Sequence, residues 1–514
     1  MGGRVEALDV IHAHRPQRVL GADREVPVRV RAEDQLREGA VSQRRRHVTD
    51  LEEAVEAQVA DALEVPHVEP GLTQHRGEQR RASVCEAREH GQAEHRRIRP
   101  DFGIELRADP SERFVHIERR AITGDMLDEG AGDRTALEVN DALARIGAQF
   151  DTEVGPDATI LTITTVARFA ARGLALLADI VVRPQFETRE FERVRQLRAN
   201  RLRQLRDMPS ALADRAFAPL LYADHPYGHL AIGTEDALQR ITVDQVRDFH
   251  QRAYRPADAT LIVVGDGAHA DLADAAAAAF GGWDGSASRD QAIDTSLRRA
   301  LNLPEIAPSH LGVIDRPGAA QSELRIGHVA VPRSTPDYPA LLLLNMVLGG
   351  QFVSRINMNL REDKGYTYGA RTAFDFRRGP GPFQVQASVQ TGATAAAIEE
   401  VLKEIESIAT SRPVSDPELA LARAALTRGY PRNFETAEQI ARSVAQLALY
   451  DLPDDYFARF VPTIAALELE TLARVAATHL NPSRLVALVV GDRAVIDSSL
   501  QTLPFGTPAA VSPV

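Results

Sequence analysis

From residue 121 onward, apolar and polar residues follow regular patterns that predict alternating helices and strands. Between residues 133 and 149, apolar residues recur at nearly helical spacing behind a polar start, which predicts an amphipathic helix. The run ATILTITTV at 158–166 is rich in β-branched residues and alternates as a strand does. The same criteria predict helices at 169–182, 186–207 and 242–254, and a buried strand at 259–266.

A segment rich in Gly, Ser and Asp, 281–296, interrupts this pattern, and a similar order of elements follows it. A strand is predicted at 322–332 and a helix at 338–350, which ends at two glycines. Two further strands, 372–378 and 383–389, flank a Gly-Pro-Gly-Pro turn. Additional helices are predicted at 394–410, 415–429 and 436–449.

The two series of elements contain a direct sequence repeat. Residues 241–266 align without gaps on residues 467–492, so that a helix, a proline and a strand ending in VVGD correspond in one register. We interpret this as two copies of one domain. The predicted fold class is α+β, with two tandem homologous α/β-roll domains in which helices pack on an antiparallel sheet. The predicted boundaries are 121–280 for the first domain, 281–308 for the linker, 309–500 for the second domain and 501–514 for a tail.

Residues 1–120 differ from the rest in composition and are left unassigned. They hold 8 of the 15 His, none of the 9 Tyr and no Lys, with 21 Arg against 23 acidic residues. Two interpretations remain open: a disordered extension, or a wrong reading frame in the gene. The second copy has two strands before its helix, whereas the first offers only FGIEL and RFVHIE as short candidates. The first domain is therefore predicted to be incomplete at its N-terminus.

Composition excludes several classes of protein. The net charge of −12 argues against nucleic acid as a partner. The single cysteine, Cys85, excludes an intramolecular disulfide and a Cys-rich zinc site. No apolar run approaches the roughly 18 residues of a membrane span, and the first 25 residues contain no apolar h-region, so no signal peptide is visible. The Arg-rich, Lys-poor composition indicates GC-rich, bacterial coding.

Four motifs resemble the pitrilysin/insulinase family of metallopeptidases, over roughly Thr123 to Asp492. They are MLDEGAG (126–132), HPYG (225–228), RPADATLIVVGD (255–266) and LREDKGYTYGA (360–370). The resemblance implies tandem α+β domains of similar fold. In active members it also implies an H-x-x-E-H zinc motif just before the Met-Leu segment, with a distant Glu as third ligand. Two ligands four residues apart on a helix face one metal, and the intervening Glu serves as general base.

This chain lacks the residues that the zinc motif requires. The five motif positions hold Ala121, Ile122, Thr123, Gly124 and Asp125. The distant ligand is expected near 197–202, where the chain offers Asn200 and Arg201. We therefore predict no metal and no cofactor in this chain, with zinc in a partner subunit.

Two other histidine-containing segments are poor metal sites. In EHGQAEH (89–95), His90 and His95 are five residues apart, so they diverge around a helix. His225 in HPYG is interpreted as a structural turn residue.

A second motif of the family is intact. By resemblance, an Arg and a Tyr seven residues apart reach across to the active site and hold the substrate carbonyl; Arg361 and Tyr368 have that spacing. A guanidinium and a phenol are donors that stabilise charge on a carbonyl oxygen. Tyr366 is a near neighbour, but the spacing favours Tyr368. We predict that both residues assist catalysis in trans.

Three hypotheses for function follow. The leading one is a non-catalytic subunit of a heterodimeric zinc metallopeptidase, which binds peptide and supplies Arg361 and Tyr368 to a partner bearing H-x-x-E-H. The alternatives are a zinc metalloendopeptidase whose motif was lost through a gene error, and a structural core subunit of a larger assembly. The family resemblance suggests a periplasmic location, although no signal peptide is visible.

Overall fold

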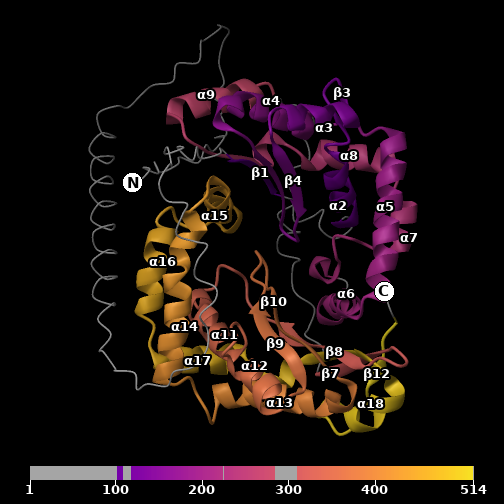
Figure 1. Ribbon diagram of the computed structural model, residues 1–514, viewed down its shortest axis with the longest axis vertical. Coiled ribbons are helices and arrows are strands. Elements are labelled where there is room, and N and C mark those ends of the chain that lie inside the picture. Colours follow the sequence, from indigo (N-terminus) through magenta and orange to yellow (C-terminus); the bar gives the residue numbers. More distant parts are fainter. Residues whose placement is uncertain (1–100, 108–116, 224, 284–308, 513–514) are drawn as a thin grey trace, which may run out of the picture. The chain divides into compact units, whose positions relative to one another are not determined.

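The computed structural model describes residues 101–107, 117–223, 225–283 and 309–512. We refer to residues 101–283 as the first half and residues 309–512 as the second half. Each half contains one β-sheet with helices packed against it (Figure 1). In these described ranges, no helix combines the length and the apolar character needed to cross a lipid bilayer.

The sheet of the first half is antiparallel, with strand order β4-β5-β1-β6. These strands are β4 (Gln149–Val154), β5 (Ala158–Thr164), β1 (Asp101–Arg107) and β6 (Ala259–Val264), with a separate short pair β2 (Gly130–Ala131) and β3 (Arg134–Thr135). The helices are α2 (Ile117–Met126), α3 (Ala136–Arg145), α4 (Ala170–Val182), α5 (Thr188–Asp207), α6 (Pro209–Tyr222), α7 (Glu235–Arg240), α8 (Val243–Ala253) and α9 (His269–Phe280).

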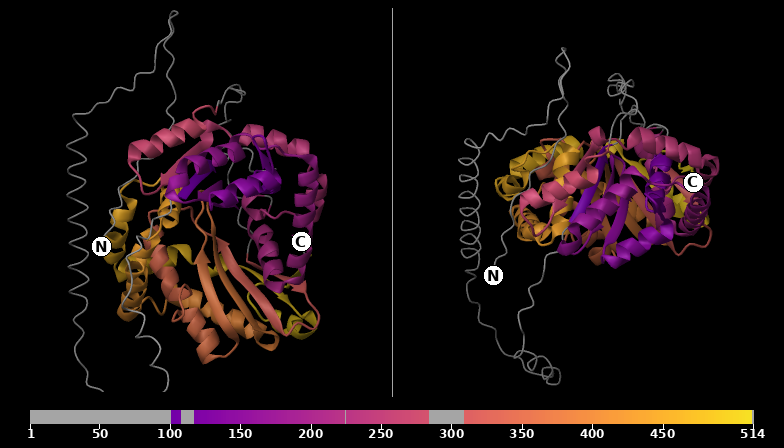
Figure 2. Two further views of the ribbon diagram at one scale, coloured as in Figure 1. Left: turned by 45° about the horizontal axis from the view of Figure 1, so that its top comes forward. Right: turned by 90° about the horizontal axis from the view of Figure 1, so that it is seen from above.

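The sheet of the second half has the order β12-β7-β11-β8-β10-β9, and its strands are seen side by side in Figure 2. They are β7 (His310–Asp315), β8 (Gln321–Val329), β9 (Thr367–Phe374), β10 (Pro382–Gln390), β11 (Val486–Gly491) and β12 (Ala509–Ala510). The helices are α11 (Tyr338–Leu348), α12 (Arg355–Asn357), α13 (Thr394–Ala409), α14 (Asp416–Arg428), α15 (Ala437–Tyr450), α16 (Tyr456–Ala465), α17 (Leu469–His479) and α18 (Arg493–Leu500).

The structure confirms the two-copy α+β fold. Strands β4-β5-β1-β6 of the first sheet correspond in order to β9-β10-β8-β11 of the second. Helix α8 leads through a turn at Pro256 into β6, and α17 leads through a turn at Pro482 into β11, in the register of the sequence repeat.

Several details differ from the predicted boundaries. The FGIEL segment forms β1, a central strand, and α2 begins at Ile117, so both precede the expected start of the first domain. The second sheet is mixed, because β7 pairs in parallel with β11 and with β12. Part of the predicted tail belongs to this half, since Leu503 and Phe505 are buried in its core. Residues 1–100, which include EHGQAEH and Cys85, lie outside the described residues.

Each sheet receives one helix from the opposite half. On β11, Ala487 and Val489 face the core beneath α11, α13 and α17, whereas Leu488 and Val490 face α6 of the first half. On β6, the residues equivalent to this second pair, Ile262 and Val264, pack against alanines of α15 from the second half. The two-residue period of a strand places these pairs on opposite faces. The halves therefore exchange α6 and α15 to complete their cores.

Candidate functional site

Helix α2 presents the positions at which the resemblance expects a zinc motif. Ala121, Ile122 and Thr123 are buried, and Ile122 and Met126 belong to the core of the first half. Gly124, at the general-base position, lies against β4: an added Cβ would be 3.0 Å from Val154 Cγ2. A larger side chain there requires the side chains of Val154 and Thr152 to move by a few tenths of an ångström. These residues do not fit a zinc ion, because Ala121 and Gly124 offer no ligand or general base and Asp125 supplies only one carboxylate.

An ion pair links α2 to α5 at this place. The carboxylate of Asp125, in the position of the second histidine, accepts a hydrogen bond from the Arg198 guanidinium. Arg198 is buried, and its second terminal nitrogen donates to the carbonyl oxygen of Ala231 at 2.5 Å. The ion pair therefore occupies the Asp125 carboxylate, which is then not available as a metal ligand.

At the distant ligand position, 197–202, the structure shows which residues face the core. Asn200 and Arg201 are exposed on α5 and bond only within that helix. The buried stripe of α5 consists instead of Phe191, Val194, Arg198 and Leu202. Sequence analysis missed Arg198, although a charged residue on an apolar stripe of helical spacing was a usable signal.

The end of α2 has an excess of negative charge. Burial, followed by the neighbouring carboxylates of Glu129 and Asp125, raises the pKa of Asp128 to about 6. Arg193 forms an ion pair with Glu129. Across the residues that the structure describes, no three His, Cys, Asp or Glu side chains are grouped so that they could hold a metal.

His225 has a structural role. Its Nδ1 accepts a hydrogen bond from the backbone N–H of Tyr227 at 3.1 Å and caps the turn 226–228. The hydroxyl of Tyr227 then donates to Asp157 at 2.7 Å and accepts from the backbone N–H of Gly379 at 2.9 Å. The HPYG motif therefore joins the first half to the turn between β9 and β10.

In the second half, Arg361 lies on a single π-helical turn, Met358–Asp363. Such turns widen the backbone locally and often occur at functional sites. Leu360 is fully buried and anchors the turn, while Arg361 points outward and is partly exposed. Its Nη1 donates to the backbone carbonyl oxygen of Tyr368 at 2.9 Å. The structure therefore brings Arg361 and Tyr368 together.

The two candidate tyrosines differ in their surroundings. Tyr368, the second residue of β9, is 86% exposed. Tyr366 is partly buried and packs against the core, and its backbone N–H donates to Leu360 at 2.8 Å. Only the Tyr368 phenol is therefore free to reach a bound molecule.

Comparison with known proteins identifies the family of one part of the chain. Residues 240–426 match the family described as "Peptidase M16 inactive domain". H-x-x-E-H occurs nowhere in the 514 residues. Residues 240–426 therefore belong to the inactive-domain type of the pitrilysin-like M16 peptidases.

The M16 relatives are distant in sequence. An uncharacterized zinc protease of Mycobacterium leprae is 24% identical over 304 residues, which are 59% of this chain and 67% of the relative. The uncharacterized zinc protease YmxG of Bacillus subtilis is 24% identical over 245 residues, 47% of this chain and 56% of its own. The probable inactive metalloprotease YmfF of the same organism is 25% identical over 224 residues, 40% and 48% of the two chains. The chain thus spans about half to two thirds of these three relatives.

Solved structures show the M16 fold. A peptidase M16 inactive domain from Pseudomonas fluorescens superposes with a TM-score of 0.70 at 22% identity, covering 77% of this chain and 93% of that one. A protease from Helicobacter pylori also gives 0.70, at 18% identity and with 76% and 94% covered.

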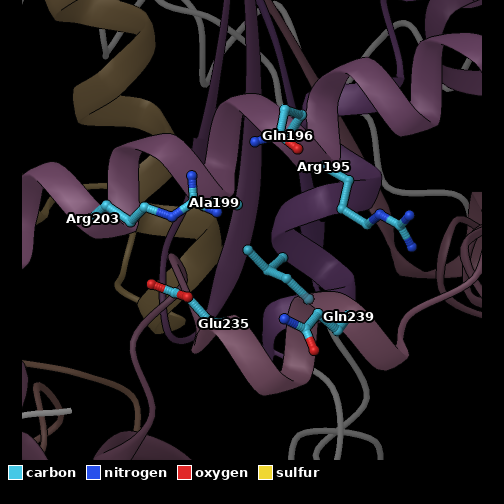
Figure 3. Close-up of a pocket in the computed structure, with 7 residues that line it drawn as sticks. Arg195, Gln196, Ala199, Arg203, Glu235 and Gln239 are labelled. Carbon is cyan, nitrogen blue, oxygen red and sulfur yellow. The ribbon is translucent and has the colours of Figure 1, made fainter.

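A small pocket of about 200 Å³ lies on this chain between α5 and α7 (Figure 3). Arg195 and Arg203 lie at opposite ends of it, and Glu235 of α7 lies between them. Its lining includes neither Arg198 nor Asp125. The pocket is therefore separate from the degenerate motif.

Proposed function

We propose that this chain is the non-catalytic subunit of a heterodimeric zinc metallopeptidase. It binds peptide and presents Arg361 and Tyr368 to the active site of a partner that bears H-x-x-E-H. The observation that carries the proposal is the contrast between the two sites. Asp125 is tied to Arg198 at the motif helix, while the exposed Tyr368 phenol and the Arg361 guanidinium lie on one corner.

The chemistry of that corner supports the assignment. The Arg361 guanidinium and the Tyr368 hydroxyl are hydrogen-bond donors, and donors positioned in advance stabilise negative charge as it forms on a scissile carbonyl oxygen. The hydrogen bond from Arg361 to the backbone of Tyr368 limits the movement of the guanidinium. Pre-organisation of this kind lowers the cost of charge stabilisation at the moment of reaction.

The test is peptide cleavage by the reconstituted pair of subunits. Arg361→Ala or Tyr368→Phe should each lower turnover on the order of a hundredfold, because each removes one donor to the developing oxyanion. Arg371→Ala is the matched control, since this exposed β9 arginine bonds only to Gln386. Size-exclusion chromatography verifies that every variant still assembles.

The alternative functions give different results. Unchanged turnover in both variants, with intact assembly, supports a structural core subunit. The purified chain alone should contain no stoichiometric zinc by elemental analysis and should cleave no peptide. One tightly held zinc per chain, together with cleavage, supports the metalloendopeptidase hypothesis instead.

A further inference from the structure

An exposed apolar side chain, Phe352, lies beside Arg361, and the next residue in the chain, Val353, is also exposed. Phe352 and Val353, in the loop between α11 and α12, are 56% and 50% exposed. The Arg361 guanidinium carbon lies 4.7 Å from the centre of the Phe352 ring, a cation–π distance. With Tyr368 these residues form what we call the apolar corner: Phe352, Val353, Arg361 and Tyr368. Grouped apolar exposure next to donors is typical of a binding surface.

Buried hydrogen bonds hold the loop that carries Phe352 and Val353. The Nδ2 of Asn357 donates to the carbonyl oxygen of Phe352 at 2.7 Å, and its Oδ1 accepts from the N–H of Ala370 in β9 at 3.0 Å. The carbonyl oxygen of Gly349 accepts from the N–H of Thr372 at 3.0 Å. Asn357 is itself buried.

This loop is therefore fixed to β9 on both sides of the exposed pair. A surface held in place before binding loses little conformational entropy when a ligand arrives. The hydrogen bonds to β9 thus keep Phe352 and Val353 exposed.

The remaining polar groups of the apolar corner indicate which kind of ligand it can bind. Arg361 directs Nη1 to the Tyr368 carbonyl and Nε to Glu362 at 3.1 Å, which leaves Nη2 to donate to an incoming acceptor. Glu362 and Asp363 are exposed on the same π-helical turn and repel a carboxylate. A neutral peptide carbonyl fits these groups better than an acidic ligand does.

We infer that Phe352 and Val353 determine peptide specificity. They contact a bulky apolar side chain of the residue next to the carbonyl that Arg361 binds. The inference rests on the proposed function, since it names the class of substrate that the Arg361 and Tyr368 corner accepts. Burying an aromatic side chain against two apolar residues favours peptides with Phe over peptides with Ala at that position.

The experiment compares binding of two capped, uncharged peptides that differ only in a central Phe or Ala. Isothermal titration with the full chain should give on the order of tenfold tighter binding of the Phe peptide. The double variant Phe352→Ala/Val353→Ala should reduce that preference to about twofold or less. Leu421→Ala/Val495→Ala is the matched control, because these residues are 48% and 52% exposed elsewhere, and it should keep the full preference.

The outcomes separate this inference from the proposed function. Arg361→Ala should weaken both peptides alike and leave their ratio unchanged. Equal binding of both peptides to the wild-type chain, or a preference that survives in the double variant, overturns the inference and leaves the role of Arg361 standing. Arg361→Ala could also change neither affinity while the wild-type preference for the Phe peptide persists. That result supports the role of Phe352 and Val353 in specificity and counts against the proposed function.

Discussion

The two halves share one fold, but each places an arginine side chain in a different environment. In the first half, the Arg198 guanidinium is buried and paired with Asp125 beside the motif helix. In the second half, the Arg361 guanidinium is partly exposed and keeps a donor directed outward. A buried, paired arginine fixes two helices together, whereas an exposed one remains available to a ligand. The first copy thus uses its arginine for a structural contact, whereas the second copy leaves its arginine at the surface.

Removing the buried arginine tests this difference most strongly. Arg198→Ala should lower the free energy of unfolding by about 1–3 kcal/mol, because it removes a buried donor to the Ala231 carbonyl and the partner of Asp125, which is 40% exposed. Arg201→Ala on the same helix should change it by less than about 0.5 kcal/mol, since Arg201 is exposed. Urea unfolding of both variants measures the effect, and similar values for the two would contradict a structural role for Arg198.

Neutralising Asp128 tests the charge at the end of α2. The folded-state pKa of about 6 lies above the usual value of 3.8, so folding favours the protonated carboxyl. The stabilising effect of protonation is complete below about pH 4 and is lost as the pH rises through 6.

Asp128→Asn should therefore raise the free energy of unfolding on the order of 1–3 kcal/mol at pH 7.5 and by little at pH 4. Urea unfolding at both pH values measures this. A stabilisation that is the same at the two values would show that the carboxylate is not the cause.

The smallest expected difference in stability is between changes at the N-termini of α8 and α17, the helices that correspond in the repeat. Thr242 caps α8 through a reciprocal pair of hydrogen bonds with Gln245, whereas Glu468 begins the equivalent α17 without a side-chain cap. Thr242→Ala should cost about 1 kcal/mol of stability. Glu468→Ala should cost less than about 0.5 kcal/mol. Thermal unfolding of the two variants compares them, and an equal loss would mean that the caps are equivalent.

The sequence predicted elements wherever a strong periodic pattern coincided with a cap or a turn. Helix α8 and strands β10 and β11 are of this kind, whereas β9 (Thr367–Phe374) begins five residues before the predicted strand 372–378. It offered FGIEL only as a short candidate strand, because the central place of β1 depends on pairing with β5 and β6, both distant in the sequence. Long-range pairing of that kind leaves no local signal.

The candidate site was predictable only in part. The spacing of Arg361 and Tyr368 was visible, and the structure brings them together. The π-helical turn could not be seen in the sequence, since its residues have an ordinary helical pattern. The partnership of Arg198 with Asp125 depends on how α2 packs against α5, and residue spacing alone does not determine that.

The exchange of α6 and α15 has a consequence for synthesis on the ribosome. Strand β6 ends at Val264, but the helix that covers its outer face begins at Ala437, 173 residues later (437 − 264). At translation rates of about 5–20 residues per second, the first sheet emerges on the order of ten seconds or more before its cover exists. During that interval Ile262 and Val264 are open to water, to chaperones and to other nascent chains.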